Sequence, residues 1–217
     1  MSIQINHQNS SLKKPSANLV LFVDENFDIS ALKKHISNVE FSYIKDLLKN
    51  NDLKKNLLFF QVNSKKTVFL LSIKKNLENS AIENLGAEFH GYIKYDNKSE
   101  YFINSDSISS KHENFIGYFL HGLKLKSYEF NLYKSKKDKK LISINIIGKK
   151  NKLTIKNELR FKAIEEGTFF ARDLVSEPPN VLNPKEYVNR LLKLRKLGIK
   201  VTTYNEKQLK KLGMHSL

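Results

Sequence analysis

The sequence predicts an α/β protein, in which a mixed sheet flanked by helices is followed by a connecting helix and the truncated opening of a second α/β domain. Up to residue 150, apolar runs of strand length alternate with amphipathic segments of helical spacing, as in layered α/β folds. A longer apolar stripe then ends at two consecutive prolines, and helix and strand signals resume behind them. We therefore expect an N-terminal domain over 1–150, a connecting helix over 151–176 and an incomplete domain over 177–217.

Three apolar runs predict the first strands. Residues 19–23 follow a polar lead-in and end at an acidic pair, as a buried strand does. Residues 57–62 and 67–73 are separated by the polar tetrad 63–66, whose composition is typical of a turn. The second and third runs are therefore expected to be neighbouring strands.

Two amphipathic segments and one further apolar run complete the predicted first domain. Apolar residues recur at three- and four-residue intervals over 41–48 and again over 115–123, which predicts two helices with one apolar face each. Residues 141–147 predict another strand. The Lys-rich stretch 134–140 is expected to be a solvated loop.

The predicted connecting helix begins near Asn157, a competent N-cap, and stops at Pro178. Its expected apolar stripe consists of Phe161, Ile164, Phe169, Ala171, Leu174 and Val175.

Behind the prolines, Asn183 as N-cap and Pro at the first helical position predict a helix over 184–196. Gly198 is expected to close it, and residues 199–203 to form a short strand. Asn205 together with Gln208 predicts a last helix, ending at Gly213.

Composition restricts the classes of function. The absence of Cys excludes disulfides, thiolate zinc sites and Cys nucleophiles, and is consistent with a reducing, cytoplasmic location. No apolar run approaches the roughly 20 residues of a membrane span, so we expect no membrane partner. The formal charge of +16 is carried almost entirely by Lys, whereas specific readers of nucleic acid rely on Arg. Any contact with nucleic acid is therefore expected to be non-specific.

No catalytic, cofactor-binding or metal-binding residue is predicted in this chain. The histidines have no ligand spacing, and no Ser lies in a G-x-S-x-G context. The acidic pairs Asp24-Glu25 and Glu165-Glu166 are adjacent residues whose side chains diverge, which favours solvated charge over acid/base catalysis. The six histidines are His7, His35, His90, His112, His121 and His215. Of these, we expect His112 to start a helix and His121 to end one.

Residues 171–184, with the sequence ARDLVSEPPNVLNP, closely resemble the junction between the two domains of the leucyl (cytosol) aminopeptidase family. Residues 205–214 are similar to the start of its catalytic domain, and residues 122–130 to part of its N-terminal domain. Two positions depart from the family pattern. Ser176 stands where the family usually has Asn, and Asn183 where it usually has Thr; the second change keeps a competent N-cap.

The resemblance implies a hydrolase that removes N-terminal amino acids from peptides, uses two divalent ions, manganese or zinc, and assembles as a homohexamer. In the family the metal ligands, a Lys among them, lie in a later stretch that includes an Asn-Thr-Asp-Ala-Glu-Gly signature. The motif at residues 104–107, Asn-Ser-Asp-Ser, lacks the Glu-Gly and lies in the wrong domain. The chain alone is therefore expected to be inactive. The family's N-terminal domain resembles the macro-domain fold, which elsewhere binds ADP-ribose, but the dispersed glycines do not form the Gly-rich loop that a pyrophosphate needs.

Two hypotheses stay open from sequence. The first is the N-terminal portion of a two-metal leucyl aminopeptidase that lacks its catalytic segment. The alternative is a non-catalytic, basic nucleic-acid-binding or regulatory module derived from that domain. The continuation of the chain into residues 177–217 favours the first, and an open reading frame beyond Leu217 that encodes the Asn-Thr-Asp-Ala-Glu-Gly region would support it further.

Overall fold

The computed structural model describes residues 2–7, 17–109, 112–136, 140–150 and 153–215. The chain divides into two compact units, Met1–Phe169 and Phe170–Leu217. This division falls within the connecting helix, and the domain boundaries expected from the sequence stay a prediction.

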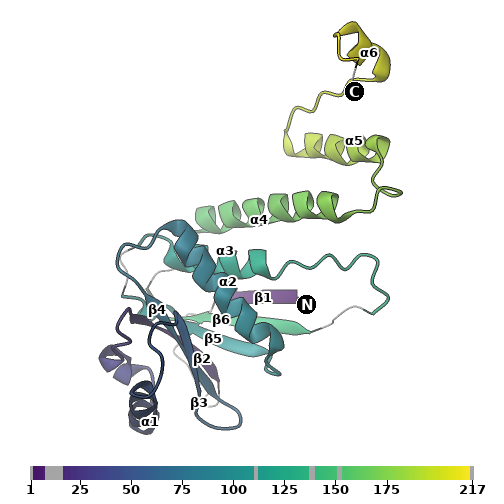
Figure 1. Cartoon of the computed structure of the whole chain (residues 1–217). Coiled ribbons are helices and arrows are strands. Elements are labelled where there is room, and N and C mark those ends of the chain that lie inside the picture. The colour runs from purple at the N-terminus through teal and green to yellow at the C-terminus, as the bar shows by residue number, and fades with distance from the viewer. Residues whose placement is uncertain (1, 8–16, 110–111, 137–139, 151–152, 216–217) are drawn as a thin grey trace. The chain divides into compact units, whose positions relative to one another are not determined.

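The first unit is built on a six-stranded mixed sheet with the order β1-β6-β5-β2-β4-β3 (Figure 1). The pairs β1–β6, β6–β5, β5–β2 and β2–β4 are parallel, whereas β3 runs antiparallel to β4. The predicted fold class of the first domain is therefore confirmed. The strands are β1 (Ser2–His7), β2 (Asn18–Asp24), β3 (Leu57–Gln61), β4 (Thr67–Ile73), β5 (Glu100–Asn104) and β6 (Leu141–Ile147).

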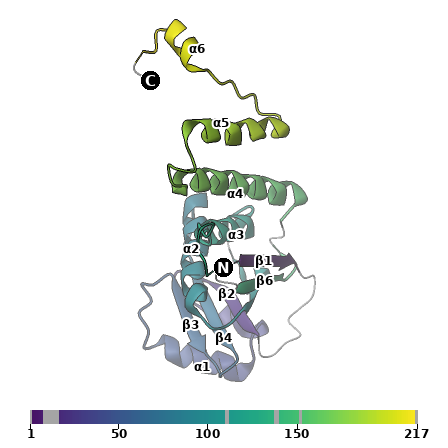
Figure 2. The same cartoon turned by 90° about the vertical axis from the view of Figure 1, so that its right-hand side faces the viewer.

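Helices cover both faces of the sheet (Figure 2). On one face α2 (Asn79–Tyr95) and α3 (Phe115–Lys126) enclose the larger core cluster, which includes Phe22, Phe89 and Phe119. On the other face the 3-10 helix η1 (Ser30–Lys34) and α1 (Asn38–Leu48) enclose a second cluster. A further 3-10 turn, η2 (Ser105–Ser107), follows β5. Strands buried on two faces read as continuous apolar runs, which is why β2 and β4 could be predicted.

Besides the short 3-10 helices, two strands and one α-helix were not predicted from sequence. Strand β1 alternates apolar and polar residues, and of its described side chains only Ile3 is fully buried. Strand β5 is short and begins and ends with polar residues. Helix α2 carries two glycines, Gly86 and Gly91, which lower helix propensity. In each case tertiary packing outweighs a weak local signal.

The crossing of α2 and α3 explains why residue 86 is a glycine. A Cβ at Gly86 would lie 1.9 Å from the Phe119 carbonyl oxygen, and a Cβ at Gly122 would lie 1.9 Å from the Glu83 carbonyl oxygen. The two helices therefore approach backbone to backbone at two reciprocal glycines, and only glycine fits at either position.

Asn18 links the central strand to both of its neighbours. Its side-chain amide donates to the Glu100 carbonyl at 2.9 Å, and its Oδ1 accepts from the Thr67 backbone N–H at 3.1 Å. The side chain is 6% exposed. One buried amide thus joins the starts of β2, β4 and β5.

Helix α4 (Ile155–Ser176) crosses the division between the units. It begins two residues before the predicted N-cap Asn157, and the hydroxyl of Thr154 accepts from the Asn157 backbone N–H, so the cap prediction was wrong. The stripe prediction was also wrong in part, because Phe161 is the buried residue of this helix while Ile164 is 42% and Val175 is 88% exposed.

The second unit contains α5 (Pro184–Leu192), the 3-10 helix η3 (Lys193–Leu197) and α6 (Glu206–Lys211). The predicted caps are confirmed: the Asn183 side chain accepts from Glu186 N–H, Gly198 adopts a φ of +81°, and Asn205 forms a capping box with Gln208. The predicted helix 184–196 tightens into η3 in its last turn.

Residues 199–203 do not form a strand, so that prediction was wrong. A strand needs a partner for its backbone groups, and the sheet described above contains no strand from this unit. None of the helices in the described ranges is long and apolar enough to cross a membrane.

Candidate functional site

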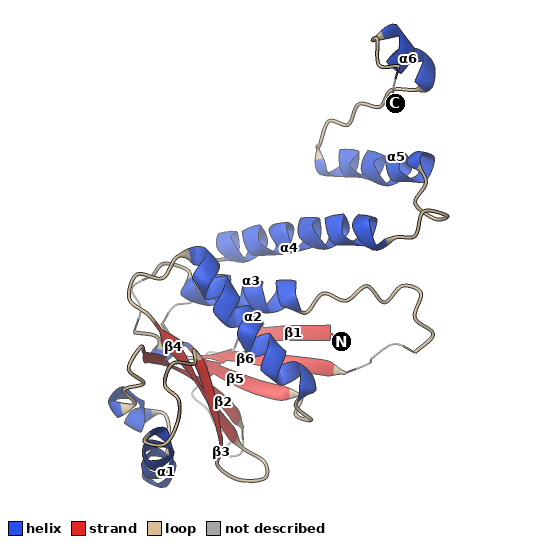
Figure 3. Cartoon of the chain, in the orientation of Figure 1, coloured by secondary structure: helices blue, strands red, loops and turns tan. Residues whose placement is uncertain are grey.

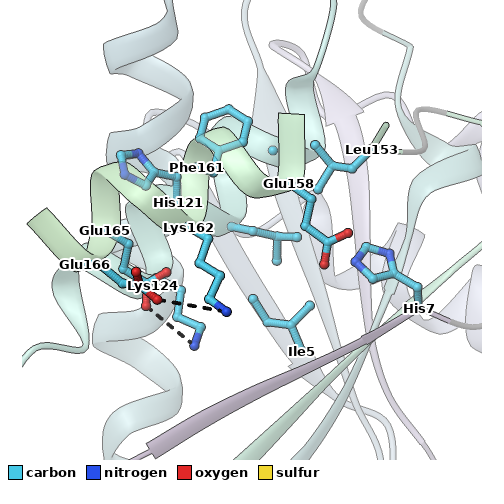
Figure 4. Close-up of a pocket in the computed structure, with 12 residues that line it drawn as sticks. Ile5, His7, His121, Lys124, Leu153, Glu158, Phe161, Lys162, Glu165 and Glu166 are labelled. Atoms are coloured by element: carbon cyan, nitrogen blue, oxygen red, sulfur yellow. Dashed lines mark ion pairs between the residues drawn. The ribbon is translucent and has the colours of Figure 1, made fainter. Parts of the chain in front are cut away.

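A hollow lined by histidine, lysine and glutamate side chains lies between β1, α3 and the first turns of α4 (Figure 4). We call it the β1–α3 pocket. Its volume is about 280 Å³, at the lower limit of small-molecule sites. The floor is apolar and the rim is charged. The lining residues are Ile5, His7, Gly117, Leu120, His121, Lys124, Leu153, Glu158, Phe161, Lys162, Glu165 and Glu166.

Phe161 seats α4 on α3 and forms one wall of the pocket. Its ring packs edge-on against Tyr118 at 5.0 Å between centroids and lies tilted against His121 at 5.4 Å. Gly117 makes room for it, because a Cβ there would lie 2.3 Å from the Phe161 ring. The amphipathic start of α4 therefore closes the pocket through a single aromatic anchor.

His121 occupies the interior of α3 and not its end, which corrects the sequence prediction. Its Nδ1 lies 2.8 Å from Glu83 Oε1, and its side chain is 5% exposed. Such a carboxylate fixes the ring orientation. Its Nε2 has no hydrogen-bond partner among the described residues. Because the ring is buried beside Phe161, its main role is to join α3 to α2 at the glycine crossing.

Lys124 is the central cation of the pocket. Its Nζ donates to the Ile3 carbonyl at 2.9 Å and lies 3.8 Å from Glu165 Oε1. On the rim, Lys162 lies 3.9 Å from Glu166, and Figure 4 shows Glu158 and His7 pointing toward one another. The acidic neighbours Glu165 and Glu166 thus engage different lysines, as their predicted divergence requires.

The pocket holds no nucleophile–base pair. Within the described residues no group of three or more His, Cys, Asp or Glu side chains is placed to hold a metal ion. The contacts of these residues attach helix α4 to α3 and occupy an edge carbonyl of strand β1.

The motif at residues 104–107 has a structural role. The Asn104 amide lies 2.9 Å from His35 Nδ1, and the Ser105 hydroxyl donates to the Ile147 carbonyl. Asp106 Oδ1 accepts from the backbone N–H groups of Lys149 and Lys150. These bonds fasten the carboxyl ends of β5 and β6 together. Burial, and then the charge of Lys34, lower the pKa of His35.

The other acidic and histidine residues that the sequence analysis rejected as sites are dispersed. Asp24 Oδ1 accepts from the backbone N–H groups of Asn26 and Asp28 and so shapes a turn. His90 is 3% exposed within α2, where burial and then the charge of Lys94 lower its pKa. His112 precedes α3, and His215 is exposed near the end of the described chain.

Sequence reasoning missed the long-range polar pairs. Lys140 was predicted to lie in a solvated loop, yet its ammonium donates to the carbonyls of Ile93, Lys94 and Asp96 at the end of α2. Residues 137–139 of that stretch lie outside the described residues. Lys66, assigned to a turn, is 6% exposed and its Nζ lies 2.6 Å from Glu40. Pairs separated by many residues leave no periodic signal in one sequence.

No family model matches the chain. Its curated relatives in sequence include two probable cytosol aminopeptidases. A probable cytosol aminopeptidase of Agrobacterium fabrum is 42% identical over 105 residues, and one of Sinorhizobium fredii is 38% identical over 106. Each match covers 46% of this chain and 21% of the relative. The chain therefore corresponds to only part of the curated relatives that it matches.

Solved structures share the fold over nearly the whole chain. A mutant of tomato leucine aminopeptidase superposes with a TM-score of 0.72 at 17% identity, covering 98% of this chain and 46% of that one. The cytosol aminopeptidase of Coxiella burnetii gives 0.61 at 15% identity over 94% and 41% of the two chains. The bottromycin maturation enzyme BotP, solved in complex with Mn, gives 0.62 at 13% identity over 91% and 40%.

Proposed function

We propose, from the relationship of this chain to the N-terminal region of the leucyl (cytosol) aminopeptidase family, that it is the N-terminal portion of a two-metal aminopeptidase. The observation that carries the proposal is the 42% identity to a probable cytosol aminopeptidase, joined to a leucine aminopeptidase fold over 98% of the chain. In this proposal residues 1–150 form a regulatory and assembly domain, and residues 177–217 begin the catalytic domain.

The exposed apolar side chains of α4 support this proposal. Ile155 is 79%, Leu159 is 62% and Val175 is 88% exposed. A helix that is apolar on more than its buried stripe needs a further surface to cover it. The structural relatives are about twice as long as this chain, and their additional polypeptide offers such a surface.

Metal chemistry would require residues other than those described here. The described side chains provide no cluster fit for a divalent ion, so no catalytic step can be assigned to them. In the complete protein, two ions, Mn or Zn, would polarise the scissile carbonyl and supply a hydroxide. A cytoplasmic location and a homohexamer belong to the same proposal.

A chimaera tests this function. The 217 residues would replace the corresponding N-terminal part of the Agrobacterium relative, and hydrolysis of a leucine anilide would be measured with Mn or Zn. We expect metal-dependent turnover by the chimaera and none by the chain alone. The catalytic part without any N-terminal domain is the control. Metal-dependent turnover by the isolated chain, or a folded chimaera that behaves like the control, would contradict the proposal.

The alternative is a basic module that contacts nucleic acid, and the charge of +16 is the observation in its favour. Lysine-dominated contacts act on phosphates without reading bases. If the chain is an aminopeptidase portion, any binding of two unrelated duplexes should be equal and should fall steeply between low and physiological salt. A sequence preference that persists at physiological salt would favour the alternative as the primary role.

A further inference from the structure

Strands β1 and β3 form the two edges of the sheet, and among the described residues no strand pairs with the outer side of β3, which we call its open side (Figure 3). The Ser72 backbone N–H donates to the Asn56 carbonyl at 2.8 Å, and Val62 N–H donates to the Lys66 carbonyl at 3.0 Å. These bonds fix the alternation of the antiparallel ladder, so the even-numbered residues of β3 face β4. The N–H and C=O groups of Leu57, Phe59 and Gln61 therefore point to the open side.

Nothing in the β3 sequence protects this edge. Its five residues, LLFFQ, include no charge and no proline, and their pairing with β4 runs without a bulge. Soluble proteins usually guard an edge with one of these features. Phe59 is 54% exposed, and its ring contacts Phe69 at 6.0 Å and Tyr92 at 5.7 Å. The open backbone groups thus lie beside an exposed aromatic side chain.

We propose that β3 pairs antiparallel with β3 of a second copy of this chain, about a two-fold axis at Phe59. Six-stranded sheets from the two copies would then become one continuous sheet. This interface is distinct from the proposed aminopeptidase function and does not depend on it.

The proposed register satisfies the open backbone groups. Phe59 would face Phe59 of the second copy, and Leu57 would face Gln61 of the second copy. Each of these residues has its N–H and C=O directed outward, so each facing pair exchanges two hydrogen bonds. The two Phe59 rings would lie on the same face of the joined sheet, where cross-strand aromatic pairs are favourable.

The charges beyond the strand are compatible with this pairing. In the same register Lys55 would face Asn63 of the second copy, Lys54 would face Ser64, and Lys65 would face Leu53. No lysine faces a lysine, which matters for a chain of charge +16. A reversed copy of an antiparallel edge always presents matching donors and acceptors, as an isologous interface requires. A second copy is therefore the partner that this edge fits.

The test is the mass of the full chain in solution, measured by sedimentation from low concentration to about 100 μM, where weak interfaces of small area become populated. The wild-type mass should rise toward that of a dimer. Phe59→Lys should abolish the rise, because it places two like charges opposite one another at the axis. Val39→Lys is the matched control, since Val39 is 80% exposed on α1 and the added charge is the same.

A second variant separates the backbone bonds from the side chain. Gln61→Pro removes an outward N–H and leaves the ladder to β4 intact, because proline is tolerated at such an edge position. It should weaken dimerisation about tenfold or more, since two of the six exchanged bonds are lost. Circular dichroism would verify that each variant is folded.

Amide hydrogen exchange provides an independent readout. Leu57, Phe59 and Gln61 should exchange more slowly as the wild-type concentration rises, and the even-numbered residues of β3 should not change. A wild-type chain that stays monomeric would overturn the proposal. A dimer that survives both Phe59→Lys and Gln61→Pro would also overturn it, because the interface would then lie elsewhere. Capture of a different extended partner at β3 by a monomeric chain would have the same consequence.

Discussion

The two edges of the sheet are finished in different ways. At β1, Lys124 from α3 donates to the Ile3 carbonyl at 2.9 Å, and the strand carries the polar residues Gln4, Asn6 and His7. At β3 no side chain of the described residues is seen to donate to an outward carbonyl, and Phe59 is exposed. At β1 a lysine of the neighbouring helix thus occupies a backbone carbonyl of the edge strand. The apolar edge strand β3 keeps its outward backbone groups available for pairing with another strand.

The largest expected effect lies on the β3 side, at the turn that sets the β3–β4 hairpin. Lys66 Nζ lies 2.6 Å from Glu40 Oε1, and the two side chains are 7% and 14% exposed. Glu40→Gln leaves the Lys66 charge buried without its counter-ion, which should lower the free energy of unfolding by about 3 kcal/mol. Urea unfolding measures the change.

The matched control for Glu40→Gln is Asp46→Asn in the same helix. The Asp46–Lys49 pair is about two-thirds exposed or more on both sides, so its loss should change stability by less than about 0.5 kcal/mol. Equal effects of the two substitutions would show that burial of Lys66 is not what anchors the hairpin.

The next effect lies at the helix that protects β1. Gly122→Ala places a Cβ about 1.9 Å from the Glu83 carbonyl oxygen, so α3 must shift away from α2. We expect the free energy of unfolding to fall by about 2–3 kcal/mol, and the amide hydrogens of β1 to exchange faster. Gly91→Ala is the control in α2, because a Cβ there meets nothing within 4 Å; it should be neutral or stabilising. A harmless Gly122→Ala would refute the close crossing.

A smaller effect is expected from removing the Lys124 ammonium that contacts the edge strand β1. Lys124→Met keeps an apolar stem and deletes the ammonium that contacts Ile3, which should cost about 1.5 kcal/mol and make β1 available for intermolecular pairing. Lys162→Met removes only an exposed ion pair at 3.9 Å and should leave both properties unchanged. Calorimetry and light scattering would measure them. If Lys124→Met neither unfolds earlier nor associates, the contrast between the edges has another cause.

Low pH should weaken the Glu40–Lys66 pair near β3 but not the hydrogen bond from Lys124 to β1. Burial raises the pKa of the Glu40 carboxyl, but hydrogen bonds from Lys66 and Ser37 lower it more, so its pKa lies below the ordinary 4.5. Stability from a depressed carboxyl pKa is present above 4.5 and is lost as the pH falls through the folded value. The stability gap between wild type and Glu40→Gln should therefore narrow below pH 4.5.

The bond from Lys124 to Ile3 has a carbonyl acceptor that does not titrate. Because Lys124 also lies 3.8 Å from Glu165 Oε1, the comparison is made with Glu165→Gln in both chains. The stability gap between Glu165→Gln and the Glu165→Gln, Lys124→Met double variant should then persist over the same pH range. Unfolding by urea at pH 7 and at pH 4 compares the two gaps. Parallel narrowing of both would place the acid-sensitive group outside the Glu40–Lys66 pair.

Sequence patterns were sufficient to predict those elements whose structure depends on residues close together in the chain. The buried runs of β2 and β4 and the caps at Asn183 and Asn205 depend on residues within a few positions of each other. The same reasoning failed for residues 199–203, because a β-branched run becomes a strand only when a partner is present. It also failed for α2, where Gly86 weakens the local signal yet is required by Phe119 on another helix.

The β1–α3 pocket could not be predicted for a related reason. Ile3 and Lys124 are separated by 121 positions, and His121 and Glu83 by 38. Neither pair has a spacing that a single sequence can reveal, and both depend on the backbone approach at Gly122. The sequence resemblance at residues 171–184 identified the family relationship, but it carried no information on these contacts.

Asn18 has a consequence for how the sheet assembles. Its amide is satisfied only when Thr67, 49 positions later, and Glu100, 82 positions later, are both in place. Either half of the sheet formed alone would leave a buried polar group unpaired, at a free-energy cost that the other half removes. The β3–β4 hairpin and the β5–β6 pair therefore gain stability from each other through one side chain, and the sheet should unfold as a single cooperative unit.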